Sequence, residues 1–235
     1  MPKIEVNYID HCGSDLTTVN AARVSFGKQS GWENEDEVWV SPYIGEVRHE
    51  MMSPWVTPVL SGRDTKLIRY LAKHKHISPF GHAFASFHIK APIFVARQLV
   101  KHKFLRWNEI SRRYVYSDVE FYVPDQWRGR SADKKQGSEG VVYPTADVAF
   151  NNYTALRTYN ELLDVGVSPE QARTVLPQSI MTEWYWSGSL DAFAAMCRLR
   201  CASDTQYESR LVADQISEEM ADLFPVSWDA LMGNS

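Results

Sequence analysis

The sequence predicts an α+β fold, a single domain in which a central, mostly antiparallel sheet is packed by helices. Its 235 residues suit one large domain, because domains usually contain about 100–200 residues. Its composition, 44% hydrophobic and 23% charged residues, is ordinary for a globular chain with a substantial core. Strand-like and helix-like segments interleave, but strand–helix–strand units are too few for a doubly wound parallel sheet. We therefore expect one domain over residues 1–235.

The N-terminal segment contains one strand, one helix and a long irregular stretch. Residues 4–9 alternate like an edge strand, and residues 16–24 have the pattern of a short helix. No period is sustained from 26 to 62, where five acidic residues lie between positions 33 and 46 and three prolines and three tryptophans interrupt the pattern. Loops of this length are usually functional or disordered, so we expect 26–62 to be an insertion or lid.

A helix is expected next, with Asp64 as its N-cap and an end near His74. Its buried face should hold Leu67, Ile68 and Leu71, which recur at helical spacing. The elements that follow are expected to be a turn over 78–81, a strand over 83–89 with Ala85, Phe87 and Ile89 on one face, a buried helix over 93–103 and a strand over 108–115.

The C-terminal half is predicted to be mainly helical. The segment 125–145 is polar and glycine-rich at its centre, which indicates a mobile loop. A capping box at 168–171 predicts a short helix to about residue 176. The remaining elements are expected to be a helix over 146–163 with Ala149, Tyr153, Leu156 and Leu163 on its buried face, a strand over 181–186, and helices over 190–201 and 205–224.

Charge, hydropathy and cysteine usage exclude several classes of protein. The 25 Lys and Arg residues and 29 Asp and Glu residues give a net charge of −4, so no global basic field attracts nucleic acid or anionic membrane. No run of 18 apolar residues and no signal-peptide pattern occurs, and we expect a cytoplasmic protein. Cys12, Cys197 and Cys201 are too few for a disulfide framework, so we expect plain thiols and no metal site.

The densest polar functionality lies in residues 97–114, which contain six Lys or Arg residues, one histidine and a single acidic residue. Side chains three and four residues apart share a helix face, and alternate side chains share a strand face. The two faces then hold Gln98, Lys101 and His102 on the helix and Glu109, Ser111 and Arg113 on the strand. Cations suit phosphate, and mixed donors and acceptors suit base edges. Charge alone, however, favours a solvated basic strip.

The order of residues in this stretch resembles the signature of the flavin-dependent thymidylate synthases, the ThyX family. That signature usually has Arg-His-Arg, then seven residues, then Ser. Here it reads Lys101-His102-Lys103, seven residues and Ser111, with Asn108-Glu109 before the serine and Arg113-Tyr114 after it. Five further segments resemble family segments and stand in family order, at 21–25, 76–80, 90–98, 172–177, and 199–200 followed by Gln206.

The resemblance implies a ThyX-like fold and an established chemistry. The family makes thymidylate (dTMP) from deoxyuridylate (dUMP), with 5,10-methylenetetrahydrofolate as one-carbon donor and NADPH as reductant through bound FAD. It works as a homotetramer whose active sites are shared between subunits. We therefore expect a flavoprotein methyltransferase of nucleotide biosynthesis, with itself as protein partner and no nucleic-acid or membrane partner.

The resemblance also implies site residues by position. Arg200 and Ser111 are the expected catalytic residues, and Arg200 would stabilise the uracil ring as its N3 proton is lost. The residues expected around dUMP are Gln98, Lys101, Glu109, Ser111, Arg112, Arg113, Arg173 and Arg200. The residues expected around FAD are Ser25, His76, Ser78, Lys101, His102, Lys103, Asn108 and Ser189.

The cysteines are consistent with this chemistry. Uracil C5 is a poor nucleophile, and other thymidylate synthases activate it by adding a cysteine thiolate to C6. No Pro-Cys-His segment occurs in the chain. A flavin that supplies hydride, with cations that polarise the pyrimidine, removes the need for that thiol.

Departures from the family pattern leave two alternatives open. Lys101 and Lys103 replace arginines, and an ammonium cannot reproduce a bidentate guanidinium contact. Gly81, which stands where an acidic residue is common, adds to the case for a hydroxymethyl-transferring or degenerate homologue. The third hypothesis is a single-stranded nucleic-acid binder that stacks bases on Phe104, Trp107 and Tyr114.

Overall fold

The computed structural model describes residues 2–34, 58–131 and 137–233. Its centre is a four-stranded sheet in the order β1-β4-β8-β5, in which every neighbouring pair is antiparallel. The strands are β1 (Glu5–Cys12), β4 (Phe84–Pro92), β5 (Leu105–Glu109) and β8 (Met181–Ser189). The predicted α+β fold with an antiparallel sheet is confirmed, and the first segment is an edge strand as expected.

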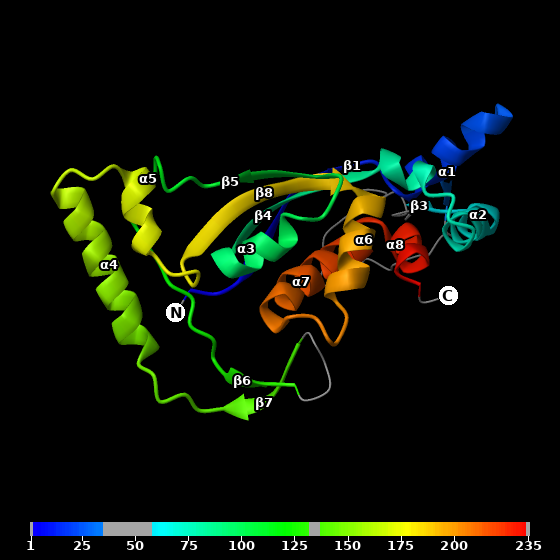
Figure 1. Cartoon of the computed structure of the whole chain (residues 1–235). Helices are drawn as coiled ribbons and strands as arrows, with labels where there is room; N and C mark the ends of the chain where they lie inside the picture. Colours follow the sequence, from blue (N-terminus) through cyan, green and yellow to red (C-terminus); the bar gives the residue numbers. More distant parts are fainter. Residues whose placement is uncertain (1, 35–57, 132–136, 234–235) are drawn as a thin grey trace, which may run out of the picture.

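One face of the sheet is buried under helices. Phe87 and Ile89 of β4 lie beside Trp184 and Trp186 of β8, and all four side chains are at most 1% exposed. Figure 1 shows α3 (Ile93–Leu99), α6 (Leu190–Arg200), α7 (Tyr207–Leu223) and α8 (Pro225–Met232) on this side. The alternation read from the sequence therefore placed the core face of β4 correctly, because its apolar residues recur at a spacing of two.

The C-terminal helix of the prediction is two helices. The chain leaves α7 at Phe224, and Pro225 starts α8 at the first helical position, where a missing N–H costs nothing. Asp15, at the start of α1 (Asp15–Arg23), accepts hydrogen bonds from the backbone N–H groups of Val226 and Ser227 at 2.9 and 2.8 Å. A buried carboxylate thus joins the N-terminal helix to the beginning of α8.

The N-terminal helices lie at one end of the sheet (Figure 1). After α1 come a 3-10 turn, η1 (Val24–Phe26), then α2 (Gly62–Lys73) and a second 3-10 turn, η2 (Ser78–His82). The N-cap of α2 is Ser61, whose Oγ accepts from the Asp64 N–H at 3.0 Å. The prediction of Asp64 as the cap was wrong, because Asp64 lies inside the first turn and bonds across to another helix.

Two short antiparallel strand pairs flank the undescribed stretches. Strands β2 (Glu33–Asn34) and β3 (Pro58–Val59) pair with each other, and most of the predicted insertion at 26–62 lies outside the described residues. Strands β6 (Trp127–Arg130) and β7 (Ser138–Val142) pair within 125–145, where the sequence predicted a loop. Strands this short among glycines and serines carry too few alternating residues to be recognised.

The opposite end of the molecule holds α4 (Val148–Asp164), α5 (Pro169–Ala172) and the 3-10 turn η3 (Arg173–Val175). The buried side chains of α4 are Asn152 and Tyr159, whereas Tyr153 is 62% exposed. The predicted face of α4, which included Ala149 and Tyr153, was therefore wrong. Figure 1 shows the reason, since α4 packs beside α5 rather than on the sheet, so its inward direction is not set by the core.

Within the described ranges, no helix combines the length and the apolar character that crossing a membrane requires.

Candidate active site

The stretch that carries the predicted site folds differently from the expectation. Helix α3 ends at Leu99 and strand β5 ends at Glu109, so the prediction of a helix to 103 and of a strand to 115 was wrong. Phe104 reverses the chain between them with φ at +65°, in the left-handed region. The reversal brings β5 close against β8, where a Cβ on Gly188 would collide with the Leu105 side chain. Tertiary pairing, not local periodicity, therefore sets both ends.

A polar cluster forms where the end of α6 meets the end of α3. Arg200 Nε donates to His102 Nε2 at 3.0 Å. Its other nitrogens lie 3.4 Å from the side-chain and backbone oxygens of Gln98, and the Gln98 amide in turn bonds to Gln206. We call Gln98, His102, Arg200 and Gln206 the Arg200 cluster. Although Lys101 and His102 lie past the end of α3, Gln98 and His102 do converge, through Arg200.

The electrostatics of this cluster keep its histidine neutral. Burial, and secondarily the Arg200 charge, lower the pKa of His102 to about 4. Because the guanidinium donates to Nε2, that nitrogen carries no proton and the neutral ring is protonated at Nδ1. Burial also lowers the pKa of Arg200, so its charge lies in a partly desolvated setting where it acts strongly on a nearby group.

A second group of predicted residues lines a pocket of about 410 Å³ between α3, β5 and η3. Glu109, Arg112 and Arg173 all contribute to its wall, together with Arg97 of α3. Glu109 Oε1 accepts from Thr182 Oγ1 at 2.7 Å. We call this cavity the nucleotide pocket after the ligand that the family resemblance predicts for it. Three arginines and a fixed carboxylate suit a phosphorylated ligand with donor groups on its base.

The two predicted arginines of the nucleotide pocket are held by backbone carbonyls. Arg112 Nη1 donates to the Ser117 carbonyl at 2.8 Å, and Arg173 Nε donates to the Glu170 carbonyl at 3.3 Å. A carbonyl fixes the direction of a guanidinium without cancelling its charge. Both side chains therefore keep a full positive charge for an anion.

A third group lines a groove of about 650 Å³ between α1 and α2. It contains Ser25, His76 and Ser78, three of the residues that the sequence assigned to FAD. Apolar side chains form much of the wall, and cationic side chains contribute to it as well. The remaining wall residues are Ala21, Ala22, Arg23, Phe26, Lys28, Arg63, Leu67, Tyr70, Leu71 and Pro79. We call this cavity the α1–α2 groove.

The other predicted site residues lie elsewhere on the chain. Lys101, Lys103 and Asn108 are exposed. Ser189 is buried at the start of α6, where its Oγ donates to Asp191 at 2.5 Å.

Past the end of β5, the chain turns at Ser111, whose Oγ accepts from the Arg113 N–H at 3.3 Å. The exposed Arg113 side chain pairs with Glu170 at 3.4 Å. The sequence predicted that Ser111 and Arg113 share a strand face with Glu109. This prediction was wrong, because β5 ends at Glu109.

Comparison with known proteins decides the family. Residues 7–226 match the family described as thymidylate synthase complementing protein. A flavin-dependent thymidylate synthase from Thermus thermophilus is 35% identical over 228 residues, which cover 96% of this chain and 74% of the relative. One from Thermotoga neapolitana is 34% identical over 227 residues, which cover 97% and 90%. The chain belongs to the flavin-dependent thymidylate synthase family.

Solved structures agree with this result. A UMP/dUMP methylase, PolB from Streptomyces cacaoi, has been solved bound with 5-Br dUMP. It matches with a TM-score of 0.72 and 31% identity over 97% of this chain and 94% of that one. The same protein bound with 5-Br UMP matches with a TM-score of 0.76 and 29% identity over 99% and 95%.

The buried thiol of this flavin-dependent thymidylate synthase homologue, Cys197, is a poor candidate for a nucleophile. All three cysteines are free, and burial raises the pKa of the Cys197 thiol well above its ordinary value. A buried neutral thiol is a poor nucleophile. None of the described residues that line the nucleotide pocket or the α1–α2 groove is a cysteine. The described ranges also hold no group of three or more His, Cys, Asp or Glu residues arranged to bind a metal.

Several residues in or beside the nucleotide pocket were not predicted from the sequence. Arg97 and Thr182 line the nucleotide pocket, and Trp107 Nε1 donates to the second oxygen of Glu109 at 3.1 Å. Thr182 lies on β8, far from Glu109 along the chain, and only strand pairing brings the two together. Arg97, by contrast, lies inside the segment 90–98, and the resemblance of this segment to the family could have identified it as a site residue.

Proposed function

We propose that this protein is a flavin-dependent methyltransferase that converts dUMP to dTMP. Its one-carbon donor would be 5,10-methylenetetrahydrofolate. NADPH would reduce bound FAD, and the reduced flavin would supply the two electrons that convert the transferred one-carbon unit to a methyl group. The observation that carries the proposal is the Arg200 cluster, a charged guanidinium in a partly desolvated site whose hydrogen-bonding partners are all uncharged. Such a group stabilises negative charge that develops on a bound pyrimidine.

The residues divide the work of binding and chemistry. Arg112 and Arg173 bind the phosphate in the nucleotide pocket, since their charges are oriented and not neutralised. Glu109, held in place by Thr182, accepts hydrogen bonds from donors of the nucleotide. Arg200 interacts with the pyrimidine as its N3 proton is lost, and Ser111 completes the predicted catalytic pair.

The α1–α2 groove is suited to part of a flavin dinucleotide. Its volume of about 650 Å³ lies in the usual range for ligand pockets, roughly 300–1,000 Å³. Its alanine, leucine and proline side chains match a flat apolar ring, and Lys28 and Arg63 in its wall match a pyrophosphate. When bound, the flavin supplies the reducing equivalents for the pyrimidine. Ser25, His76 and Ser78 hold it there, and His102, Lys101, Lys103, Asn108 and Ser189 are the proposed contacts from elsewhere.

The distribution of these residues supports a homotetramer with shared active sites. The α1–α2 groove is lined by residues of α1 and α2, and the nucleotide pocket by residues of α3, β5 and η3. Figure 1 shows α1 and α2 at one end of the chain and α5, which η3 follows, at the other. The exposed turn with Lys101, Lys103 and Phe104, whose ring is 84% exposed, belongs to neither wall. A complete site is then built when another copy brings its groove to the nucleotide pocket of the first.

We also propose a cytoplasmic location for the protein.

The visible absorption spectrum of the purified protein tests the proposal. We expect a flavin band when FAD is added, and a change in that band when dUMP follows. Turnover with methylenetetrahydrofolate and NADPH should then give dTMP, identified by mass, with UMP run beside dUMP as a second substrate. A hydroxymethylated product would support the related-enzyme alternative, and the absence of flavin binding would contradict the proposal. The family and its relatives favour the methyltransferase over either alternative.

A further inference from the structure

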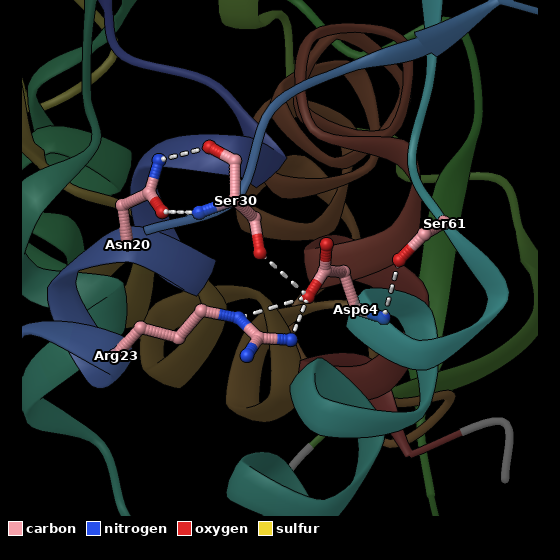
Figure 2. Close-up of polar contacts among 5 residues, drawn as sticks. All are labelled: Asn20, Arg23, Ser30, Ser61 and Asp64. Atoms are coloured by element: carbon pink, nitrogen blue, oxygen red, sulfur yellow. Dashed lines mark hydrogen bonds and ion pairs between the residues drawn. The ribbon is translucent and has the colours of Figure 1, made fainter. Parts of the chain in front are cut away.

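One buried carboxylate joins the two helices that form the α1–α2 groove. Asp64, in the first turn of α2, is 3% exposed. Its Oδ1 accepts from Arg23 Nε at 3.0 Å, from a second nitrogen of the same guanidinium, and from Ser30 Oγ at 3.1 Å. Figure 2 shows these contacts converging on one oxygen. The last residue of α1 is thereby fixed to the beginning of α2.

A second set of bonds fixes the chain between Arg23 and Ser30. The Asn20 side chain donates to the Ser30 carbonyl at 3.1 Å and accepts from the Ser30 N–H at 2.7 Å (Figure 2). The two ends of this segment are thus both held, one by Asp64 and the other by Asp64 and Asn20. Ser25 and Lys28, which line the groove, lie within the segment, so their backbone position depends on the network.

Asp64 acts on the groove through its neighbours. Arg23 lines the groove, whereas Asp64 lines an adjoining cavity that shares Arg23, Lys28 and Arg63 with the groove. Burial raises the pKa of Asp64, but hydrogen bonding with Arg23 and the adjacent serines outweighs burial and lowers the pKa below its ordinary value. The carboxylate is therefore charged at neutral pH, and it compensates the Arg23 charge.

The energetics of such a pair favour a geometric role. Removing two charges from water costs nearly as much as their attraction returns, so buried ion pairs contribute little net stability. Their bonds are nevertheless directional, because a planar guanidinium accepts few arrangements around a carboxylate. The consequence for the α1–α2 groove is a fixed distance between its walls.

We propose that Asp64 is a positioning residue for the flavin. Through Arg23 and Ser30 it holds the segment with Ser25 and Lys28 against α2 in the arrangement that binds FAD. This inference rests on the proposed function, because it assumes that the groove receives the flavin.

The test is Asp64→Asn in the full chain, with FAD affinity measured by flavin absorbance and fluorescence. The amide keeps the size of the side chain but loses the charge, so the dissociation constant should rise roughly 10-fold or more, as for loss of a charged hydrogen bond. The flavin spectrum should also shift, because the ring is held differently. The affinity for dUMP, measured by calorimetry without flavin, should stay within about twofold, since neither Asp64 nor its bonded partners Arg23 and Ser30 belong to the wall of the nucleotide pocket.

The matched control is Asp15→Asn. Asp15 is also a buried carboxylate of α1, 4% exposed, but it bonds to the backbone at the start of α8 and lies outside the groove. This substitution should lower the thermal midpoint while leaving FAD affinity unchanged below that temperature. Equal losses of FAD affinity in both variants would mean that Asp64 only stabilises the fold, and would overturn the inference.

A milder variant covers the case in which Asp64→Asn does not fold. Ser30→Ala removes one bond to Asp64 and leaves both Asn20 bonds intact. It should weaken FAD binding about threefold, in keeping with loss of one ordinary hydrogen bond. Wild-type affinity in this variant would overturn the inference. If the unmodified protein binds no FAD, the proposed function itself fails, which is a distinct result.

Discussion

The two ends of the molecule hold their arginines in different ways. At the α1–α2 groove, Arg23 bonds to the buried carboxylate of Asp64. At the nucleotide pocket, Arg112 and Arg173 bond to backbone carbonyls. Arg200 has a neutral imidazole and an amide as partners. Where a carboxylate holds the guanidinium, the charge is compensated and only its geometry remains useful. Where a neutral group does so, both the charge and the direction remain available to a ligand.

The partner of a guanidinium therefore indicates its role. Removing an arginine that has neutral partners should affect ligand binding or turnover, whereas removing Arg23, which pairs with Asp64, should affect the shape of the α1–α2 groove. The Asp64→Asn and Ser30→Ala variants test the ion-pair side. The experiments below begin with two arginines that have neutral partners, then turn to the neutral partner His102 and to the exposed lysines, from the largest expected effect to the smallest.

Arg200→Ala should remove most turnover. A guanidinium aimed at developing charge in a partly desolvated site contributes as an oxyanion-hole donor does, so kcat should fall roughly 10²–10³-fold. The thermal midpoint should change little, because Arg200 lies at the last turn of α6 and is not part of the apolar core. Steady-state kinetics with saturating dUMP and folate measure the effect. Near-normal kinetics would contradict the assignment of Arg200.

Arg173→Ala should weaken nucleotide binding and spare the flavin. Loss of one charged contact to a phosphate raises the dissociation constant for dUMP by about 10–100-fold, measured by calorimetry. FAD affinity, measured without dUMP, should be unchanged, because Arg173 belongs to the wall of the nucleotide pocket and not to that of the α1–α2 groove. Arg157→Ala is the control, since this exposed arginine of α4 pairs with Glu161, four residues on, and is not one of the residues that line the nucleotide pocket. A loss shared by both variants would point to a general charge effect.

The lowered pKa of His102, the neutral partner of Arg200, should make the stability of the fold depend on pH. The pKa of His102 is lowered from 6.5 to about 4 in the folded chain, so the unfolded chain binds an additional proton between these values. Stability contributed by the neutral ring is therefore present above pH 6.5 and is lost as pH falls toward 4. His102→Asn should flatten the thermal midpoint over this interval, whereas His74→Asn, at an exposed position of α2's end, should leave the His102 contribution in place.

The sequence was informative where local pattern and tertiary structure agree. Strand β4 was predicted because Phe87 and Ile89 alternate toward one core. The ends of α3 and β5 were not predicted, because Phe104 takes its left-handed conformation to let β5 meet β8. The same holds for the sites. The motif order supplied Glu109 and Arg200, whereas Thr182 and Asp64 matter only through partners that lie far along the chain.

The smallest expected effect concerns the exposed turn that departs from the family pattern. Lys101→Arg and Lys103→Arg, combined, should leave FAD and dUMP affinities unchanged or tighten them by up to about threefold, because a guanidinium adds a planar second donor at no change of charge. Both side chains are exposed, so the larger group meets no packing obstacle within the chain. A large loss of nucleotide or flavin affinity would show that this site is built around ammonium groups. Such a loss would also explain why this chain has Lys101 and Lys103 where the family usually has arginines.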